Sequence, residues 1–368
     1  MNKNRIIHLI TTIERGGAEK QLLILTQEQI LQGLDVEVFY LKGKPELKSE
    51  FEKFGVKVNQ SLVNKTFIKQ NIIFRKIIRS RGDVVHAHLP KSELITAITC
   101  HKNRFVVTRH NSEAFWPGMP KIISNFLSKF VTEKSAHVIC ISEAVKKYIV
   151  NRGEVSKRCQ ISTIHYGYDK NYQINSSTRN EFSTIFKPFR SSLKIGTIGR
   201  LVNQKDYPTL FSACKSALSK GVELELFIIG EGELRKDLEV RVKSLGITKN
   251  VHWLGKTADI NDYLFELDLF ILPSKYEGFG LVLLEVMQAG KPILAPNNSS
   301  IPEVLGSSYK GLFKTSDVSE LSELIIKIQK DASFPTRLVQ TYSDRLALFA
   351  PSNMSEKISH IYENMGFI

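Results

Sequence analysis

Residues 267–290, LDLFILPSKYEGFGLVLLEVMQAG, join an apolar run to a second apolar run through a short polar loop. The first run, 267–272, predicts a buried strand, and the loop contains Gly278 and Gly280. The second run predicts a helix at 279–289, because glycine and proline follow it at the usual stop positions. Glycines before a helix start allow the backbone to approach a ligand closely, and the free N–H groups there suit a diphosphate.

Two glutamates bracket the start of this predicted helix. Glu277 precedes the helix at the expected mouth of a cleft, and Glu285 lies inside an apolar run. A carboxylate in such a run is costly unless it meets hydroxyl groups or a cation, and a ribose diol would satisfy it. The alternative is that Glu285 faces solvent on an amphipathic helix and Glu277 is an ordinary acid at a helix start. We favour the first interpretation, which predicts a site for an activated sugar.

The length and composition of the chain limit its class. At 368 residues, the chain is long enough for two domains that each bury a full core. Its 4 cysteines show no paired spacing, so neither a disulfide framework nor a zinc site is expected. No apolar stretch approaches the roughly 18 residues of a membrane span. We therefore expect a cytoplasmic protein that is soluble or bound peripherally at a membrane surface.

Charge is divided unevenly along the chain. Residues 1–190 hold 31 Lys or Arg against 16 Asp or Glu, whereas residues 191–368 hold 20 against 21, so the halves carry +15 and −1. This asymmetry predicts that the first half faces an anionic partner such as a phospholipid surface, a lipid diphosphate or nucleic acid. A basic, solvated surface without such a partner is the alternative.

Short apolar strands alternate with longer amphipathic segments in both halves. This βαβ rhythm predicts parallel sheets covered by helices. We therefore expect an α/β fold of two Rossmann-like, doubly wound domains facing across a cleft, since such sheets bind ligands beyond the carboxyl ends of their strands. The expected boundaries are 1–172 for the first domain, 173–191 for a linker and 192–350 for the second domain. The expected strands are 5–12, 36–41, 84–88, 105–109 and 137–142, and then 193–198, 224–229, 252–254, 267–272 and 292–295.

Two further glycine turns follow predicted strands. Gly199 and Arg200 begin one turn, and Lys205 follows five residues later, so two cations could clamp two phosphates. Gly16 and Gly17 lie between the first strand and the first helix, which is the position of a phosphate-binding turn. The full dinucleotide fingerprint is absent, so NAD binding is disfavoured. Ordinary tight turns are the alternative at both places.

Histidines gather at the ends of two predicted strands. His86 and His88 end one strand, and His110 follows the next. Because the ends of neighbouring parallel strands share one rim, these imidazoles would lie where they can donate to sugar hydroxyls or phosphate. No carboxylate or cysteine partner lies at ligand spacing, and the chain has no Asp-x-Asp pair. We therefore expect no metal site and metal-independent chemistry.

Two amphipathic segments of the first half combine bulky apolar residues with lysine and arginine. Residues 65–81 do so at roughly helical spacing, and residues 120–131 have a similar character. Helices of this kind could lie on an anionic bilayer. The alternative, which we favour for 65–81, is an ordinary helix whose apolar stripe packs on the sheet.

Taken together, these motifs resemble family 4 of the retaining glycosyltransferases along nearly the whole chain. The resemblance implies the GT-B fold, with acceptor binding in the first domain, donor binding in the second, and a C-terminal helix, here 351–368, that crosses back to the first domain. The segment 165–169 departs from the family's Asn-Gly-Val-Asp turn and matches it only in Gly and Asp. The matching motifs are Gly16-Gly-Ala-Glu19, Thr108-Arg-His-Asn111, Ile141-Ser-Glu-Ala144, Gly199-Arg200 with Lys205, Gly230-Glu-Gly232, and Glu277 with Glu285.

The resemblance also implies a role for each motif. The two cations would stabilise the developing diphosphate charge, the second glutamate would hold the ribose, and the first would orient the sugar together with the helix-start amides. The glycine pair would approach the diphosphate from the opposite domain, and the histidine would contact the sugar or the phosphate. The nucleotide sugar is a substrate, so no cofactor is implied. The implied catalytic residues are His110, Arg200, Lys205 and Glu277, and the implied donor-binding residues are Gly16, Gly17, Gly199, Arg200, Lys205, Gly278, Phe279, Gly280, Leu281 and Glu285.

We therefore predict a retaining, hexosyl-type glycosyltransferase that moves a sugar from a nucleotide-diphosphate sugar to a glycan or lipid-linked acceptor in cell-surface polysaccharide biosynthesis. Its basic first domain would rest on the inner face of the plasma membrane. A nucleotide-sugar epimerase of the same fold is the alternative enzyme, and it fits the glutamate pair less well. A nucleic-acid-binding protein ranks last, because basic and aromatic residues do not interleave in the first half as RNA-binding surfaces require.

Overall fold

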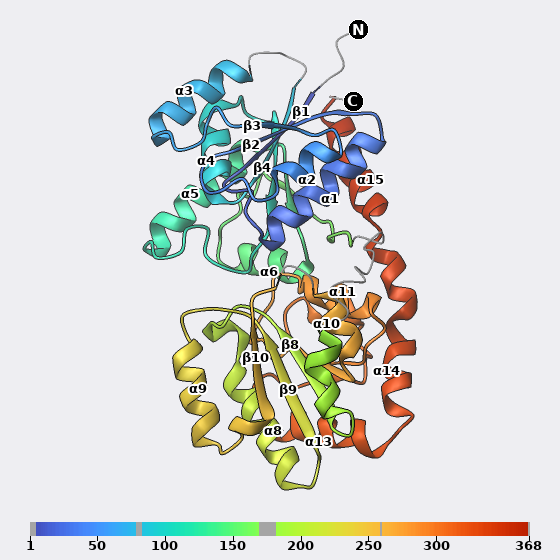
Figure 1. Cartoon of the computed structure of the whole chain (residues 1–368). Coiled ribbons are helices and arrows are strands. Elements are labelled where there is room, and N and C mark those ends of the chain that lie inside the picture. The colour runs from blue at the N-terminus through green and yellow to red at the C-terminus, as the bar shows by residue number, and fades with distance from the viewer. Residues whose placement is uncertain (1–4, 79–82, 169–181, 258–259, 367–368) are drawn as a thin grey trace. The chain divides into compact units, whose positions relative to one another are not determined.

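The computed structural model describes residues 5–78, 83–168, 182–257 and 260–366 (Figure 1). The chain forms two compact units. Unit 1 comprises Met1–Asp169 with Phe349–Ile368, and unit 2 comprises Lys170–Leu348. The sequence analysis puts the corresponding boundaries at residues 172 and 351.

Unit 1 is built on a parallel sheet of seven strands in the order β3-β2-β1-β4-β5-β6-β7. Every residue of β4 and β5 is buried, although two of the five residues of β4 are histidines. Such burial is typical of parallel strands whose two faces are both covered. The strands are β1 (Arg5–Ile10), β2 (Asp35–Tyr40), β3 (Lys57–Asn59), β4 (Val84–His88), β5 (Phe105–Arg109), β6 (His137–Cys140) and β7 (Gln160–Thr163).

Helices connect the successive parallel strands of unit 1 (Figure 1). The C-terminal helix α15 (Pro351–Asn364) packs on α1, and Ser355 Oγ donates a hydrogen bond to Gln32 Oε1 at 3.3 Å. The last two residues of the helix expected at 351–368 lie outside the described residues. The other helices are α1 (Gly17–Leu31), α2 (Lys48–Lys53), α3 (Phe67–Ile77), α4 (Pro90–Thr99), α5 (Lys121–Lys134) and α6 (Glu143–Asn151).

Unit 2 contains a parallel sheet of six strands in the order β10-β9-β8-β11-β12-β13. The two parallel sheets confirm the predicted α/β fold of two Rossmann-like domains. The strands are β8 (Leu193–Ile198), β9 (Leu224–Ile229), β10 (Val251–Gly255), β11 (Leu269–Ile271), β12 (Ile293–Pro296) and β13 (Leu312–Phe313). The helices are α8 (Tyr207–Ser219), α9 (Arg235–Ser244), α10 (Asn261–Glu266), α11 (Leu281–Gln288), α12 (Ile301–Leu305), α13 (Val318–Lys330) and α14 (Phe334–Ser343), with short 3-10 turns at Lys187–Phe189, Asn203–Lys205, Thr248–Asn250 and Asp344–Phe349.

The linker expected at 173–191 is wrong in its second part. Residues 182–186 are helical and lead into a 3-10 turn, Lys187–Phe189. Phe182 and Phe186 are buried, with their rings each 5.9 Å from the ring of Tyr263. These aromatic side chains bring the segment into the core of unit 2, and the polar residues around them conceal this in the sequence. Residues 173–181 lie outside the described residues.

The three strands that the sequence analysis missed, β3, β7 and β13, lie at sheet edges. They contain two to four residues, and none of the residues of β3 or β7 is fully buried. An edge strand of this kind lacks the apolar run that identifies a central strand. Among the described residues, no helix has the length and apolar composition needed to span a membrane.

Candidate functional site

In unit 2, the carboxyl ends of β8, β9, β11 and β12 lie at one edge of the parallel sheet. Backbone and side-chain hydrogen bonds join the loops that leave this edge. Lys275 N donates to Gln204 O at 2.8 Å, and Asn298 Nδ2 donates to Lys275 O at 3.0 Å. The fold therefore brings together the predicted site segments 199–205 and 277–285, which are about seventy residues apart in the chain. We call this edge the unit 2 rim.

A largely buried ion pair lies at the unit 2 rim. Lys205 Nζ donates to Glu277 Oε1 at 2.5 Å, and their side chains are 14% and 9% exposed. Ser274 Oγ donates to the same carboxylate oxygen at 2.6 Å. Glu277 lies four residues before the first residue of α11, so it is not an ordinary acid in the helix start. A charged pair this well shielded from solvent forms a strong hydrogen bond and positions both groups.

Two glycines lie where the backbone approaches this pair, Gly199 and Gly230. A Cβ on Gly199 would lie 3.1 Å from Lys205 Cε, so the absence of a side chain allows the lysine stem to pass. A Cβ on Gly230 would lie 1.9 Å from Gly199 O, which no rearrangement of side chains could relieve. The glycine motifs at the ends of β8 and β9 therefore pack against each other. Gly199 also leaves room for the Lys205 side chain, which helps to position it.

Arg200 differs from Lys205 in its environment. Its side chain is exposed, and its Nη2 reaches Gln204 Oε1 at 3.5 Å, which is a long hydrogen bond. An exposed guanidinium at the strand edge can turn toward an anionic ligand at little cost, whereas Lys205 must share its charge with Glu277.

Helix α11 begins at the unit 2 rim. Its N-cap, Gly280, has a φ of 84°, a left-handed conformation that favours glycine, and no side-chain cap closes the helix. Leu283 N already donates to Gly280 O at 2.8 Å, so the N–H groups of Leu281 and Val282 are those that the helix start can offer to an anion. Phe279 is buried, and Gly278 and Leu281 are half-buried.

Glu285 lies on the more accessible side of α11. It is half-buried, together with Leu281 four residues earlier and Val282 three residues earlier, which places the three on one face of the helix. Leu283, Leu284, Val286 and Met287 are buried. The apolar run thus has a core face, and Glu285 is on the other face. It is neither buried in the core nor fully exposed to solvent, so its position lies between the ligand-binding and the solvent-facing alternatives.

In unit 1, the glycine pair lies where α1 begins. Gly16 is the N-cap, Gly17 is exposed, and no side-chain hydrogen bond caps the helix. A Cβ on Gly16 would lie 2.3 Å from Glu19 Oε2, and Thr12 Oγ1 donates to Glu19 Oε1 at 2.5 Å. Gly16 therefore accommodates the Glu19 carboxylate, while Gly17 leaves its backbone open to a ligand.

His110 follows β5 at the carboxyl-end edge of the unit 1 sheet, which we call the rim of unit 1, and it is 8% exposed. Its Nε2 contacts His88 Nδ1 at 3.2 Å, and its Nδ1 is hydrogen-bonded to the Tyr166 hydroxyl. Burial lowers the pKa of His110 to about 3, so the ring is neutral at physiological pH. Both ring nitrogens have partners within unit 1, so a ligand can hydrogen-bond to this ring only by replacing one of them.

His86 does not reach the rim as the sequence analysis expects. Its ring is fully buried, and its two nitrogens contact the Tyr362 hydroxyl at 2.6 Å and Thr108 Oγ1 at 2.7 Å. His86 and His88 are two residues apart on β4, so their side chains share one face of the sheet, and both are buried inside unit 1.

The comparisons with known proteins assign the family. The family model named Glycosyltransferase Family 4 matches residues 15–172, and the one named Glycosyl transferases group 1 matches residues 179–344. The chain belongs to the group 1 glycosyltransferases. This membership favours a transferase over the epimerase alternative.

Relatives of this transferase are similar over most of their length. The chain is 23% identical to the capsular polysaccharide biosynthesis glycosyltransferase CapM of Staphylococcus aureus, over 90% of each chain. It is also 23% identical to the UDP-Gal:alpha-D-GlcNAc-diphosphoundecaprenol alpha-1,3-galactosyltransferase of Escherichia coli, over 70% of this chain and 69% of that protein. HepE of Anabaena, solved in complex with UDP, has the same fold with a TM-score of 0.81 at 19% identity, covering 98% of this chain and 100% of that chain.

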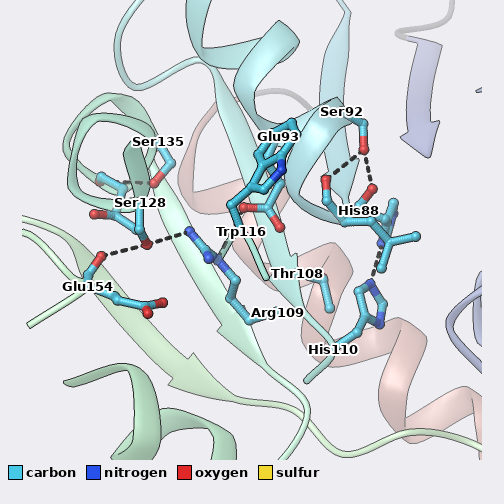
Figure 2. A network of polar contacts seen from close by, with 12 residues as sticks. His88, Ser92, Glu93, Thr108, Arg109, His110, Trp116, Ser128, Ser135 and Glu154 are labelled. Atoms are coloured by element: carbon cyan, nitrogen blue, oxygen red, sulfur yellow. Dashed lines mark hydrogen bonds and ion pairs between the residues drawn. The ribbon is translucent and has the colours of Figure 1, made fainter. Parts of the chain in front are cut away.

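A buried ion network supports the rim of unit 1 in this transferase. Figure 2 shows the Arg109 guanidinium between Glu93 and Ser128, with Nε 3.1 Å from Glu93 Oε2 and Nη2 3.0 Å from Ser128 Oγ. Arg109 also lies over the ring of Phe115, 4.4 Å from its centre. Burial raises the pKa of Glu93 to about 7, against the opposing effect of Arg109. The network fixes the loop after β5, and with it the residue that follows Arg109, His110.

The sequence analysis missed two residues that contact the predicted site. Ser274 binds Glu277, and Tyr166 binds His110. Tyr166 lies in the segment 165–169 that departs from the family turn, so this departure was the available signal. The same segment is closely packed, because a Cβ on Gly167 would lie 2.8 Å from Pro351 Cα.

The structure also brings His8 close to His86 and His88, which lie far from it in the sequence. One ring nitrogen from each of His8, His86 and His88 lies within 4.8 Å of the other two. The sequence analysis considered carboxylate and cysteine partners along the chain and overlooked His8, which the register of β1 places beside His86.

Proposed function

We propose that this glycosyltransferase is a retaining, hexosyl-type enzyme that moves a sugar from a nucleotide-diphosphate sugar to a glycan or lipid-linked acceptor in cell-surface polysaccharide biosynthesis. The observation that supports this most is the unit 2 rim. Exposed Arg200, the Lys205–Glu277 pair and the uncapped start of α11 meet there at the carboxyl ends of parallel strands. Cations and helix-start amides suit a diphosphate, and a fixed carboxylate suits sugar hydroxyls.

The reaction needs stabilisation of the charge that develops on the departing diphosphate. Arg200 and the N–H groups of residues 278–281 would supply it. Lys205 would also contribute, by contacting the phosphate as well as Glu277. Glu277 would orient the sugar, and Glu285 would bind the ribose. In unit 1, Gly17 and His110 would serve the same donor. Same-face attack would retain the anomeric configuration, with the departing phosphate accepting the acceptor's proton.

The proposed donor is a substrate, and no cofactor or metal ion is proposed. Protein cations and helix-start amides can carry out the charge neutralisation that a metal ion provides in other transferases. HepE, which shares the fold, was solved with UDP, and this makes UDP-sugars the first donors to test.

The donor assignment is tested with a panel of UDP-, GDP- and ADP-sugars. At least one should raise the unfolding temperature of the protein and be slowly hydrolysed. Arg200→Ala and Glu285→Ala should each abolish that thermal shift, and Lys220→Ala is the matched control, because Lys220 is an exposed cation at the opposite end of α8. If every nucleotide sugar is inert, or if the control behaves like the site variants, the donor assignment is wrong. Product analysis by NMR then tests retention.

A lipid-linked acceptor is supported by an exposed apolar and basic face of unit 1. Ile68 and Ile72 on α3 are 72% and 52% exposed, and Ile122 and Phe126 on α5 are 84% and 69% exposed. The alternative of a stripe packed on the sheet holds for one side of α3, where Phe74 is fully buried and its ring lies 6.1 Å from the ring of Phe39 on β2. The other side of α3 keeps Ile68 and Ile72 exposed. Residues 79–81 of this predicted segment lie outside the described residues.

Helix α4 contacts both of these helices, so α3, α4 and α5 are neighbours in unit 1 (Figure 1). Exposed lysines and arginines accompany them, namely Lys65, Lys69, Arg75, Lys76, Lys121 and Lys129. Apolar side chains with a basic surround suit the anionic cytoplasmic leaflet. We therefore propose peripheral attachment at that leaflet, where a lipid-linked acceptor would be presented. The relative from Escherichia coli is named for a diphosphoundecaprenol-linked acceptor.

Attachment is tested by sedimentation with anionic liposomes. Ile122→Asp combined with Phe126→Asp should release the protein from the liposomes, because each substitution places a charge in the apolar contact. Val240→Asp is the matched control, since Val240 is 68% exposed on α9 of unit 2. Equal binding of all three proteins, or binding to neutral liposomes alone, would show that α5 does not attach the enzyme to anionic lipid.

A further inference from the structure

A chain of histidine side chains crosses the core of unit 1 and ends at His110. His8 Nε2 contacts Gln29 Oε1 at 2.8 Å, and His8 Nδ1 contacts His88 Nε2 at 3.0 Å. His88 Nδ1 then contacts His110 Nε2 at 3.2 Å. The last contact joins His110 Nδ1 to the Tyr166 hydroxyl. The three histidines thus connect a glutamine on α1 to the rim of unit 1.

The sheet creates this arrangement. His8 on β1 and His88 on β4 lie two residues out of register across a parallel pair, and β5 is the next strand. Figure 2 shows the rings of His88 and His110 side by side at the end of these strands. Parallel pairing therefore places in contact three residues that are up to 102 positions apart in the sequence.

The contacts give the chain a direction. Gln29 Oε1 can only accept, so His8 must carry its proton on Nε2 and accept through Nδ1. His88 must then donate from Nε2 and accept through Nδ1, and the same holds for His110. The remaining group, the Tyr166 hydroxyl, donates to His110 Nδ1. Each ring makes two hydrogen bonds, and no ring is required to carry a charge.

The series of histidine hydrogen bonds ends at Gln29, in the core of unit 1. Gln29 is fully buried, and an amide oxygen does not accept a proton at physiological pH. Protons therefore cannot pass through the chain, which excludes a proton-relay role. Burial also lowers the pKa of His8 to about 4, and that of His88 well below its ordinary value, so both rings are neutral. A neutral chain with a fixed donor direction can only determine orientation and tautomer.

We propose that His8 and His88 are positioning residues that hold His110 in one orientation, with its proton on Nε2. The inference rests on the proposed function in one respect, namely that His110 serves the donor. In this arrangement His110 Nε2 is bonded to His88, so Nδ1 is the His110 nitrogen that points away from the other two histidines. This Nδ1 is a hydrogen-bond acceptor. A ligand that replaces Tyr166 must therefore supply a donor, as a hydroxyl group does and an ionised phosphate does not.

The tautomers can be measured on the whole chain without any ligand. Long-range proton–nitrogen correlation NMR of [15N]histidine-labelled protein distinguishes protonated from unprotonated ring nitrogens. At pH 7.5, His8, His88 and His110 should each be protonated at Nε2 and unprotonated at Nδ1. Protonation at Nδ1 of His8 or His110 would overturn the proposal. Stoichiometric zinc in the purified protein would also overturn it, because the histidine rings would then be metal ligands.

Two substitutions test the direction. Tyr166→Phe removes the hydroxyl at the outer end and should leave the Nε2 tautomer of His110 unchanged, because the inner end sets it. His88→Phe removes the acceptor for His110 Nε2 and should abolish the single tautomer. His86→Phe is the matched control, since His86 is equally buried on the same strand and bonds to Tyr362 and Thr108 instead. The same tautomer in the His88 and His86 variants would refute the positioning role.

Activity provides a separate readout. With a donor from the panel, His88→Phe should lower kcat/KM by about 10- to 100-fold, the effect of a displaced group at a reacting centre. His86→Phe should lower it no more than its loss of stability explains. Should His88→Phe not fold, the tautomers of the native protein and of Tyr166→Phe still decide the proposal. If no donor binds, the proposed function fails, whereas the NMR measurement still tests the chain.

Discussion

The Lys205–Glu277 pair allows a quantitative test of the unit 2 rim. Its atoms are 2.5 Å apart, and its side chains are 14% and 9% exposed, so water screens the pair much less than an exposed one. A hydrogen bond between charged groups in this setting contributes roughly 1.5–3 kcal/mol, whereas exposed ion pairs contribute roughly 0.2–1 kcal/mol. Removing one partner leaves the other charge buried and should cost about 3 kcal/mol.

The perturbation is a double-mutant cycle with Lys205→Met and Glu277→Gln. Glutamine keeps an oxygen for the Ser274 hydroxyl, so the cycle isolates the ion pair. Each single variant should lose about 3 kcal/mol of unfolding free energy. The double variant should lose less than the sum, with a coupling free energy of about 1.5–3 kcal/mol.

Guanidinium denaturation followed by tryptophan fluorescence measures these free energies. The chain has 2 tryptophans, Trp116 in unit 1 and Trp253 in unit 2. A Trp116→Phe background therefore makes the signal specific to unit 2. A coupling below about 0.5 kcal/mol, as for a surface pair, would refute the reasoning that this pair is buried and fixed.

Three other predictions concern packing and protonation. Gly230→Ala should lose more than about 3 kcal/mol of unfolding free energy, because the new Cβ would overlap Gly199 O, whereas Gly221→Ala, with nothing within 4 Å, should lose only about 1 kcal/mol for its left-handed backbone; urea denaturation compares them. The pKa of His8 is about 4 in the folded state and ordinary in the unfolded state, so as the pH falls from 6.5 to 4 the unfolded chain takes up a proton that the folded chain does not. This group should therefore lower the unfolding free energy of unit 1 by up to ~1.4 kcal/mol per pH unit. Unfolding midpoints that stay constant over that interval would contradict this prediction. Arg109→Leu leaves Glu93 without its cation, and since a protonated carboxyl is less costly to bury, the loss of stability should be larger at pH 8 than at pH 6; a pH-independent loss would mean that Glu93 does not ionise there.

Local patterns in the sequence were sufficient to predict the fold. The central strands, such as β4, β5, β8 and β9, coincide with the predicted runs 84–88, 105–109, 193–198 and 224–229. Central parallel strands are buried on both faces and therefore need continuous apolar runs, which can be read directly from the sequence. The edge strands β3, β7 and β13 and the aromatic contacts of residues 182–189 carry no such local signal, and the sequence analysis missed them.

The site residues show the same division. The sequence alone determined that glycines, cations and glutamates follow the ends of strands, because turn chemistry and helix starts depend on neighbours in the chain. Only the tertiary structure decided that Lys205 pairs with Glu277, that Ser274 supports the pair, and that His110 is bound on both sides. These contacts join segments that strand order and register bring together, and register acts between strands, where a single sequence contains no direct record of distance.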